Sequence, residues 1–222
     1  MKTLLSDNSS NNHSDNHIPF DQNFIIENLK KEDHELIGIV TKFGGLCELI
    51  CNFLLKNNIL TDINENHDPF DCITLKAINM TEIKTSHLLL VYSLFHKIIA
   101  FLFKVYPDNI FSCFDQWKLV KKANNTISVN EKLFQKKLKE IKINETLKFE
   151  VFSKTLTGLE GHSMLIKKTG EETYIFFDPN EGADLNLNLN DLTEKVNSAL
   201  NEYRGTDLFF TKGSDFLKRL PK

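Results

Sequence analysis

Three residues of the chain carry the side chains that catalysis by a thiol requires. Cys47 lies in the segment GGLCELI, and His162 and Asp178 lie in the segment GHSMLIKKTGEETYIFFDPNEG. A cysteine nucleophile needs a base that removes its proton and a third residue that orients the base. We therefore predict that Cys47 is a nucleophile, with His162 as its general base and Asp178 as the orienting carboxylate.

The segment from His162 to Asp178 is predicted to form a β-hairpin. HSMLIKK and ETYIFF are largely apolar, and between them lies Gly170, a residue type that readily takes positive φ. With Gly170 at the centre of the turn, His162 and Asp178 are equally far from it and pair directly. Paired residues share a face with Cβ atoms about 4.5–5.5 Å apart, so an imidazole N–H can donate to the carboxylate. A register shift of one residue would place the two side chains on opposite faces.

Cys47 is predicted to lie in the first turn of a helix over residues 45–57. Gly44 and Gly45 allow a tight turn before it. At a helix start, the unsatisfied N–H groups and the helix dipole favour a thiolate. Glu48 also suits a helix start, although its negative charge opposes ionisation of the neighbouring thiol. The apolar residues that follow at helical spacing are Leu46, Leu49, Ile50, Phe53 and Leu54.

Each of the three residues also has an ordinary structural interpretation. A cysteine near a helix start is usually a small buried hydrophobe, a histidine on a strand is mostly structural, and Asp-Pro-Asn is a turn signal. The thiol at a Gly-Gly helix start and the His/Asp hairpin occur together here, in the order of papain-like enzymes. That combination favours the catalytic interpretation.

The two passages resemble the YopT/AvrPphB-type papain-like cysteine proteases that bacterial pathogens inject into host cells. The resembling features are GGLC opening a helix, GH opening a strand and FFDPNEG closing the next one. The resemblance implies the same three roles for Cys47, His162 and Asp178, and an endopeptidase acting on a host protein. It also implies secretion by a specialised bacterial system into the host cell cytosol. The chain departs from the family in two ways. Glu48 follows the cysteine, where the family usually has a small or aromatic residue. The tryptophan that usually comes next in the cysteine helix is also missing, because the one tryptophan of the chain is Trp117.

The side-chain donor of the oxyanion hole is not identified by the sequence. Gln22, Asn23 and Asn28 are upstream candidates, whereas the nearest upstream neighbours of the cysteine helix are Thr41 and Lys42. The backbone N–H of Cys47 can supply one donor.

The triad leaves several functions open. The same thiol chemistry on a peptide bond makes an endopeptidase, on a glutamine side chain a deamidase, and with an amine acceptor a transglutaminase. A non-catalytic module that binds a host protein on a degenerate papain-like scaffold is the contrasting hypothesis.

Composition limits the remaining function classes. The net charge is −3 and the pI about 6.2, so a nucleic-acid-binding surface is not indicated. The cysteines at positions 47, 51, 72 and 113 form no CxxC pair and are interpreted as reduced thiols. A metal pair of Cys47 and Cys51 is less favoured than a buried structural thiol at Cys51. No cofactor or metal is therefore expected, and the sequence does not indicate an oligomeric state.

The most apolar stretch, residues 87–103, is interrupted near its middle by His96 and Lys97. A membrane-spanning helix needs about 20 apolar residues and tolerates a central charge poorly. We therefore predict a buried core helix over residues 86–105, with no stable membrane insertion. His96 is interpreted as a core residue rather than a second base.

The order of the remaining elements predicts an α+β, papain-like fold. Residues 1–18, rich in Asn, Ser and Asp, are predicted to be a disordered leader, and residues 19–222 a single domain. Helices come first and an antiparallel sheet follows, with the cysteine helix packed on the sheet that carries His162 and Asp178. A loop that contains Trp117 is expected after the core helix. Strands are expected at 146–154 and 206–212, and a helix capped by Asp191 between them. An amphipathic helix over 128–143 is expected, with an apolar face on or near which lie Val129, Leu133, Phe134, Leu138 and Ile141.

Overall fold

The computed structural model describes residues 16–23, 27, 46–61, 63, 70, 115–117, 119–121, 126–155, 158–205 and 207–218. The predicted core helix at 86–105, with His96 and Lys97, lies outside these residues, as do Asn28, Thr41, Lys42, Cys72 and Cys113. The strands are β1 (His17–Pro19), β2 (Asp115–Trp117), β3 (Leu119–Lys121), β4 (Ile127–Val129), β5 (Thr146–Thr155), β6 (Gly158–Lys168), β7 (Tyr174–Asp178), β8 (Gly182–Leu187) and β9 (Asp207–Lys212). The helices are α3 (Cys47–Lys56), the short 3-10 helix η1 (Ile59–Thr61), α5 (Glu131–Lys139), α6 (Leu189–Glu202) and α7 (Gly213–Leu217).

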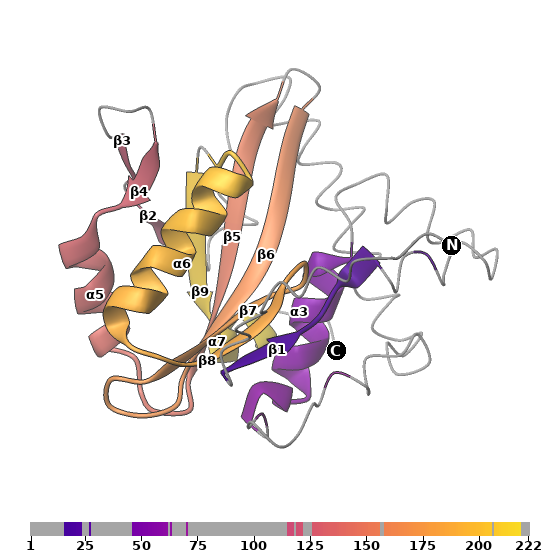
Figure 1. Cartoon of the computed structure of the whole chain (residues 1–222), viewed down its shortest axis with the longest axis vertical. Coiled ribbons are helices and arrows are strands. Elements are labelled where there is room, and N and C mark those ends of the chain that lie inside the picture. The colour runs from indigo at the N-terminus through magenta and orange to yellow at the C-terminus, as the bar shows by residue number, and fades with distance from the viewer. Residues whose placement is uncertain are drawn as a thin grey trace, which may run out of the picture.

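The described part of the chain has an α+β fold built on one large sheet. Its strand order is β1-β8-β7-β6-β5-β9-β2, and each neighbouring pair is antiparallel. A separate two-stranded sheet joins β3 and β4. Helix α3 lies on one side of the large sheet, and α5 and α6 lie on the other (Figure 1). The sheet is therefore covered on both faces.

Alternation along the strands divides the core into two clusters. On β6 and β7, Leu165, Ile175 and Phe177 face α3, whereas Met164 and Ile166 face α5 and α6. The α3 cluster consists of Leu46, Leu49, Ile50, Cys51, Phe53, Leu54, Leu55, Leu60, Ile63, Phe70, Leu165, Ile175, Phe177, Ala183 and Leu185. The α6 cluster consists of Val129, Phe134, Leu138, Ile141, Leu147, Phe149, Val151, Met164, Ile166, Tyr174, Phe176, Leu192, Val196, Ala199, Leu200, Leu208 and Phe210.

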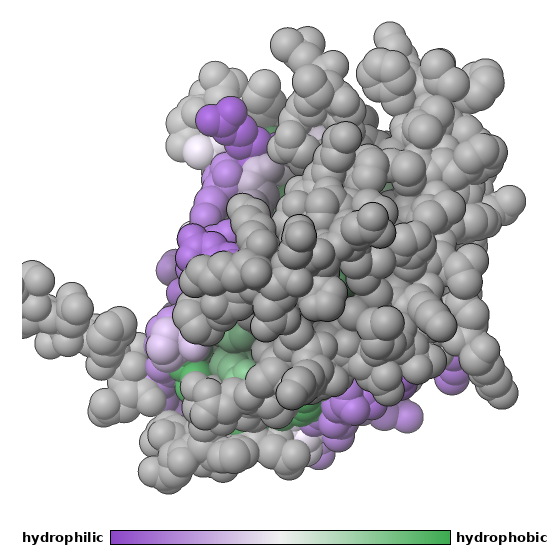
Figure 2. Space-filling model, turned by 90° about the vertical axis from the view of Figure 1, so that its right-hand side faces the viewer, coloured by the Kyte–Doolittle hydropathy of each residue, from purple (hydrophilic) through white to green (hydrophobic). Residues whose placement is uncertain are grey.

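The α3 cluster reaches the surface at its margin. Its partly buried members there are Ile18, Phe20 and Ile59. Figure 2 views the molecule from this side and shows a small apolar area, in green, next to hydrophilic residues in purple.

The predicted register of the β6–β7 hairpin is wrong by two residues. Lys168 pairs with Tyr174 and Leu165 with Phe177, so the ladder does not place His162 opposite Asp178. The loop is longer than predicted because the Thr169 N–H donates to the Thr173 carbonyl at 2.9 Å and closes residues 169–173. Gly170 does not take the positive φ that the sequence suggested. A Cβ there would meet the Thr173 hydroxyl, at the end of a side chain that can rotate away.

Four other expectations change in detail. Leu133 is 52% exposed, because it lies about 100° around α5 from the buried Phe134. The N-cap of α6 is Asn188, whose side chain accepts from the N–H groups of Asn190 and Asp191. Trp117 belongs to β2 rather than to a loop. Residues 17 and 18, assigned to the leader, lie in β1 and pair with β8. Among the described residues, no helix combines the length and apolarity needed to cross a membrane.

Candidate active site

Cys47 is the first residue of α3 and is 3% exposed. Leu46 precedes the helix and gives its first turn no side-chain cap. The Leu46 carbonyl accepts the first helical hydrogen bond, from the Ile50 N–H at 2.9 Å. Cys47 therefore lies at the positive end of the helix dipole, among the unsatisfied N–H groups of the first turn.

His162 and Asp178 lie within hydrogen-bonding distance of each other. The Nε2 of His162 is 2.8 Å from Oδ1 of Asp178, and both side chains are buried. Since a carboxylate only accepts, Nε2 carries the proton and donates it to Asp178. The error in the predicted register does not remove this contact. A shift of two residues keeps both side chains on one face of the sheet, where they are diagonal neighbours.

The ends of the two strands bring the imidazole within reach of α3. β6 continues to Gly158 paired with β5, but its ladder with β7 stops at Leu165. His162 therefore lies on a part of β6 that has a paired strand on one side only, among the residues that the structure describes. That open edge is where the start of α3 meets the sheet, since Glu48 accepts from the Ser163 hydroxyl. Interaction with Cys47 is one of the causes that raise the pKa of His162.

The protonation of His162 reflects both neighbours. Burial acts to lower its pKa, but the hydrogen bonds to Asp178 and Cys47 and the negative charges of these groups raise the pKa from 6.5 to about 10. The site thus favours the imidazolium, which is the state of His162 once it has taken the proton of Cys47.

The Asp178 carboxylate is held by two further donors that the sequence analysis did not single out. The Asn180 N–H donates to Oδ1 at 2.8 Å, which is the Asx turn expected of Asp-Pro-Asn. The Tyr203 hydroxyl donates to Oδ2 at 2.9 Å. The Tyr203 ring also stacks on the imidazole of His162, with centroids 3.9 Å apart and an interplanar angle of 29°.

The end of α6 places Tyr203 at the site. Arg204 takes a left-handed conformation with φ 49°, and the Gly205 N–H then donates back to the Leu200 carbonyl at 2.7 Å. This closes the helix as a Schellman-type cap. Nothing in the local sequence around Tyr203 distinguishes it from any other helix-terminal tyrosine, so only the fold reveals its role.

Gln22, one of the candidate oxyanion donors, is buried beside the Asp-Pro-Asn turn. Its backbone N–H donates to the Pro179 carbonyl at 2.8 Å, and its Nε2 donates to Oδ1 of Asn180. Asn180 in turn donates through Nδ2 to the Tyr203 hydroxyl at 2.9 Å. In this arrangement the amide of Gln22 supports Asn180. The second candidate, Asn23, is exposed.

Gly182 allows the N-terminal strand to approach this turn. It pairs with Asp178 on one side and with Pro19 on the other. Its φ is +121°, and a Cβ there would collide with the backbone of Ile18. Only glycine fits this position, which brings β1 and Gln22 next to the end of β7.

Cys51 is a buried thiol one turn after Cys47. Its Sγ donates to the Ser163 carbonyl at 3.3 Å, and burial raises its pKa well above 9.0. It is therefore a neutral thiol in this structure. Among the described residues, no group of His, Cys, Asp and Glu side chains is arranged to hold a metal ion.

Comparison with known proteins finds one likeness, at the level of structure. No family model and no curated relative matches the sequence. Among solved structures, the chain is similar to the Pseudomonas avirulence protein AvrPphB, with 10% sequence identity and a TM-score of 0.45. The likeness covers 74% of this chain and 90% of that one. A likeness of this degree says nothing about chemistry, which has to be judged from the residues of this chain.

Proposed function

We propose that the chain is a papain-like thiol hydrolase in which Cys47, His162 and Asp178 form a catalytic triad. One observation carries the proposal: Cys47 at the start of α3 interacts with the imidazole of His162, and the Nε2 of that imidazole is held by the buried carboxylate of Asp178. Each of the three groups has the neighbour that its role requires.

The reaction is an acyl transfer. His162 takes the proton of Cys47, and the thiolate attacks a substrate carbonyl. The negative charge on the carbonyl oxygen develops near the first-turn amides of α3. The imidazolium then protonates the leaving amine, and water resolves the thioester. Asp178 keeps the Nε2 proton of His162 in place throughout.

We propose a peptide bond of a host-cell protein as the substrate, with the chain acting as an injected bacterial effector. This part of the proposal is supported by the resemblance of the GGLC, GH and FFDPNEG passages to YopT/AvrPphB-type proteases. Deamidation or transglutamination by the same triad is the second candidate, since the geometry is common to all three reactions.

Substrate mapping tests the proposal. Host-cell lysate is incubated with the wild-type protein or with Cys47→Ala, and new protein N-termini and modified glutamines are located by mass spectrometry. New N-termini that depend on Cys47 support the protease. Glutamine deamidation or cross-linking without cleavage supports the second candidate. Identical products from both proteins, with retained binding of a lysate protein, contradict catalysis and favour the non-catalytic module.

A further inference from the structure

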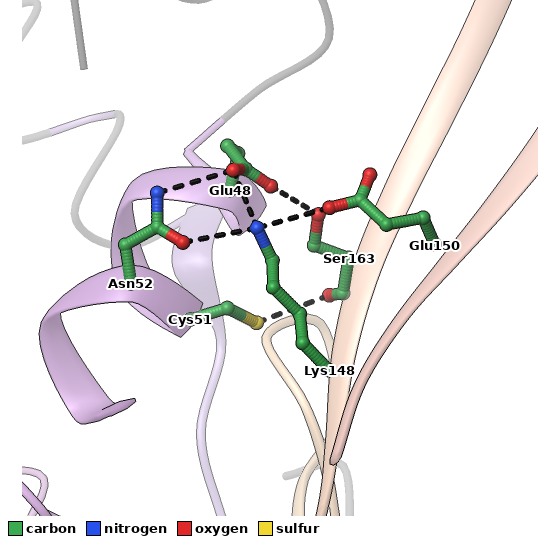
Figure 3. Close-up of polar contacts among 6 residues, drawn as sticks. All are labelled: Glu48, Cys51, Asn52, Lys148, Glu150 and Ser163. Carbon is green, nitrogen blue, oxygen red and sulfur yellow. Dashed lines mark hydrogen bonds and ion pairs between the residues drawn. The ribbon is translucent and has the colours of Figure 1, made fainter. Parts of the chain in front are cut away.

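A group of charged and polar side chains, buried except for the partly exposed Glu48, lies between α3 and the sheet and takes no part in the acyl transfer (Figure 3). Lys148 of β5 is at its centre and is fully buried. Its Nζ donates to Oε1 of Glu48 at 2.5 Å, to Oε1 of Glu150 at 2.9 Å and to Oδ1 of Asn52 at 3.0 Å. Three acceptors therefore match the three N–H donors of an ammonium group.

Glu48 connects this group to the strand of His162. Its Oε2 accepts from the Ser163 hydroxyl at 2.6 Å. Glu48 directly follows Cys47, and Ser163 directly follows His162, so this hydrogen bond lies one residue from each member of the candidate pair. The contact of Cys51 with the Ser163 carbonyl adds a second link. The start of α3 is thus attached to β6 immediately beside the thiol and the imidazole.

The side chains of this group also determine the net charge next to Cys47. The titratable groups here are Glu48 and Cys51 from α3, Lys148 and Glu150 from β5, and His162 from β6. Helix α7 meets α3 at its other end, where Gly213 lies against Leu55.

The two carboxyl groups have pKa values shifted in opposite directions. Burial acts to raise the pKa of Glu48, but the charge of Lys148 and hydrogen bonds from its neighbours lower it to about 2. Burial, together with the charge of Glu48, raises the pKa of Glu150 to about 8. Lys148 therefore balances the one anion, Glu48, that adjoins the nucleophile.

We propose that Lys148 is a positioning residue for Cys47 and His162. It cancels the charge of Glu48 beside the thiol and, through Glu48 and Ser163, fixes α3 against the strand that carries His162. The inference rests on the proposed function, because the group has this role only if Cys47 is the nucleophile. Without Lys148, Glu48 loses the charge that lowers its pKa most. Its side chain is 36% exposed and still accepts from Ser163 and Asn52, so water and these donors solvate the carboxylate, and its charge then opposes the thiolate.

The test is the rate at which limiting iodoacetamide alkylates Cys47 in the folded protein, followed from pH 5 to 9. Lys148→Met should slow the reaction at pH 6 about tenfold and move its midpoint to higher pH by about one unit. Lys148→Met with Glu48→Gln removes the uncompensated anion as well and should return the rate to within about threefold of the wild type. Lys168→Met is the matched control. Its Nζ, also buried, donates to the carbonyls of Lys139 and Ile141, and its loss should leave the rate unchanged.

Ser163→Ala gives a second test that leaves the buried lysine in place. It removes the hydrogen bond between Glu48 and β6, and the rate at pH 6 should fall severalfold with unchanged circular dichroism. A wild-type rate in Ser163→Ala overturns the positioning role. The charge role is overturned if Lys148→Met reacts at the wild-type rate. It is also overturned if the double variant reacts as slowly as Lys148→Met. These results leave the proposed function standing if wild-type Cys47 reacts faster than Cys51. If it does not, the proposed function fails and this inference with it.

Discussion

Tyr203 offers the sharpest test of how the imidazole is held, because its ring and its hydroxyl make separate contacts. Tyr203→Phe keeps the stack on His162 and removes only the hydroxyl that donates to Asp178. Burial and the charge of Asp178 raise the pKa of Tyr203 above its ordinary value, so the hydroxyl donates throughout the range from pH 5 to 9. The effect of Tyr203→Phe should therefore be independent of pH across that range.

The size of the effect depends on the hydrogen bonds that Asp178 keeps in Tyr203→Phe. A hydrogen bond to a charged group contributes about 1.5–3 kcal/mol. Asp178 keeps its donors from His162 and Asn180, and Tyr203 is only half-buried, so water can replace part of the loss. We expect the free energy of unfolding to fall by about 1 kcal/mol and the alkylation of Cys47 to slow about three- to tenfold.

Tyr203→Leu is the matched variant, since it loses the stack as well. It should be about 1 kcal/mol less stable than Tyr203→Phe and slower again in alkylation. Urea unfolding and the iodoacetamide rate at pH 6 measure both quantities. A Tyr203→Phe protein with the wild-type rate would refute the idea that the hydroxyl aligns Asp178.

Three further predictions concern Asp178, Glu150 and the cap of α6. Asp178→Ala removes the acceptor shared by His162, Asn180 and Tyr203, so alkylation of Cys47 should slow about a hundredfold or more with native circular dichroism; wild-type reactivity would contradict the triad. The folded-state pKa of Glu150, about 8, lies above its ordinary 4.5, so the wild type loses stability as the pH rises from 4.5 through 8. Residue 150 does not titrate in Glu150→Gln, so the free energy of unfolding of this variant should rise relative to that of the wild type across that window, as urea unfolding at several pH values measures. A difference that stays constant with pH would argue against a proton on Glu150. Asn188→Ala removes the α6 cap and should cost about 1 kcal/mol in urea unfolding without changing Cys47 alkylation; a slower rate would show that the cap also positions Tyr203.

The contact between His162 and Asp178 could be predicted from sequence because strand geometry tolerates the error made in the register. Side chains alternate with a period of two, so a ladder displaced by two residues still leaves both groups on one face. The length of the loop could not be predicted, because it depends on the hydrogen bond between Thr169 and Thr173. The helix start at Cys47 agrees with the sequence pattern to within two residues.

Lys148 and Glu150 could not be recognised in the same way. The alternation in TLKFEVF is typical of a strand with one buried and one solvated face, and the polar positions are then assigned to solvent. In the structure α3 covers that second face, so both side chains are buried and have to pair. Tyr203 and Gln22 reach the site only through long-range packing, which no local pattern encodes.

Thiol reactivity tests the central claim most directly. The folded protein is treated with limiting iodoacetamide from pH 5 to 9, and the modified cysteines are located by mass spectrometry, with His162→Ala alongside. The account predicts that Cys47 reacts far faster than Cys51 below pH 7 and that this advantage disappears in His162→Ala. A Cys47 that reacts no faster than Cys51, or as fast without His162, would contradict it.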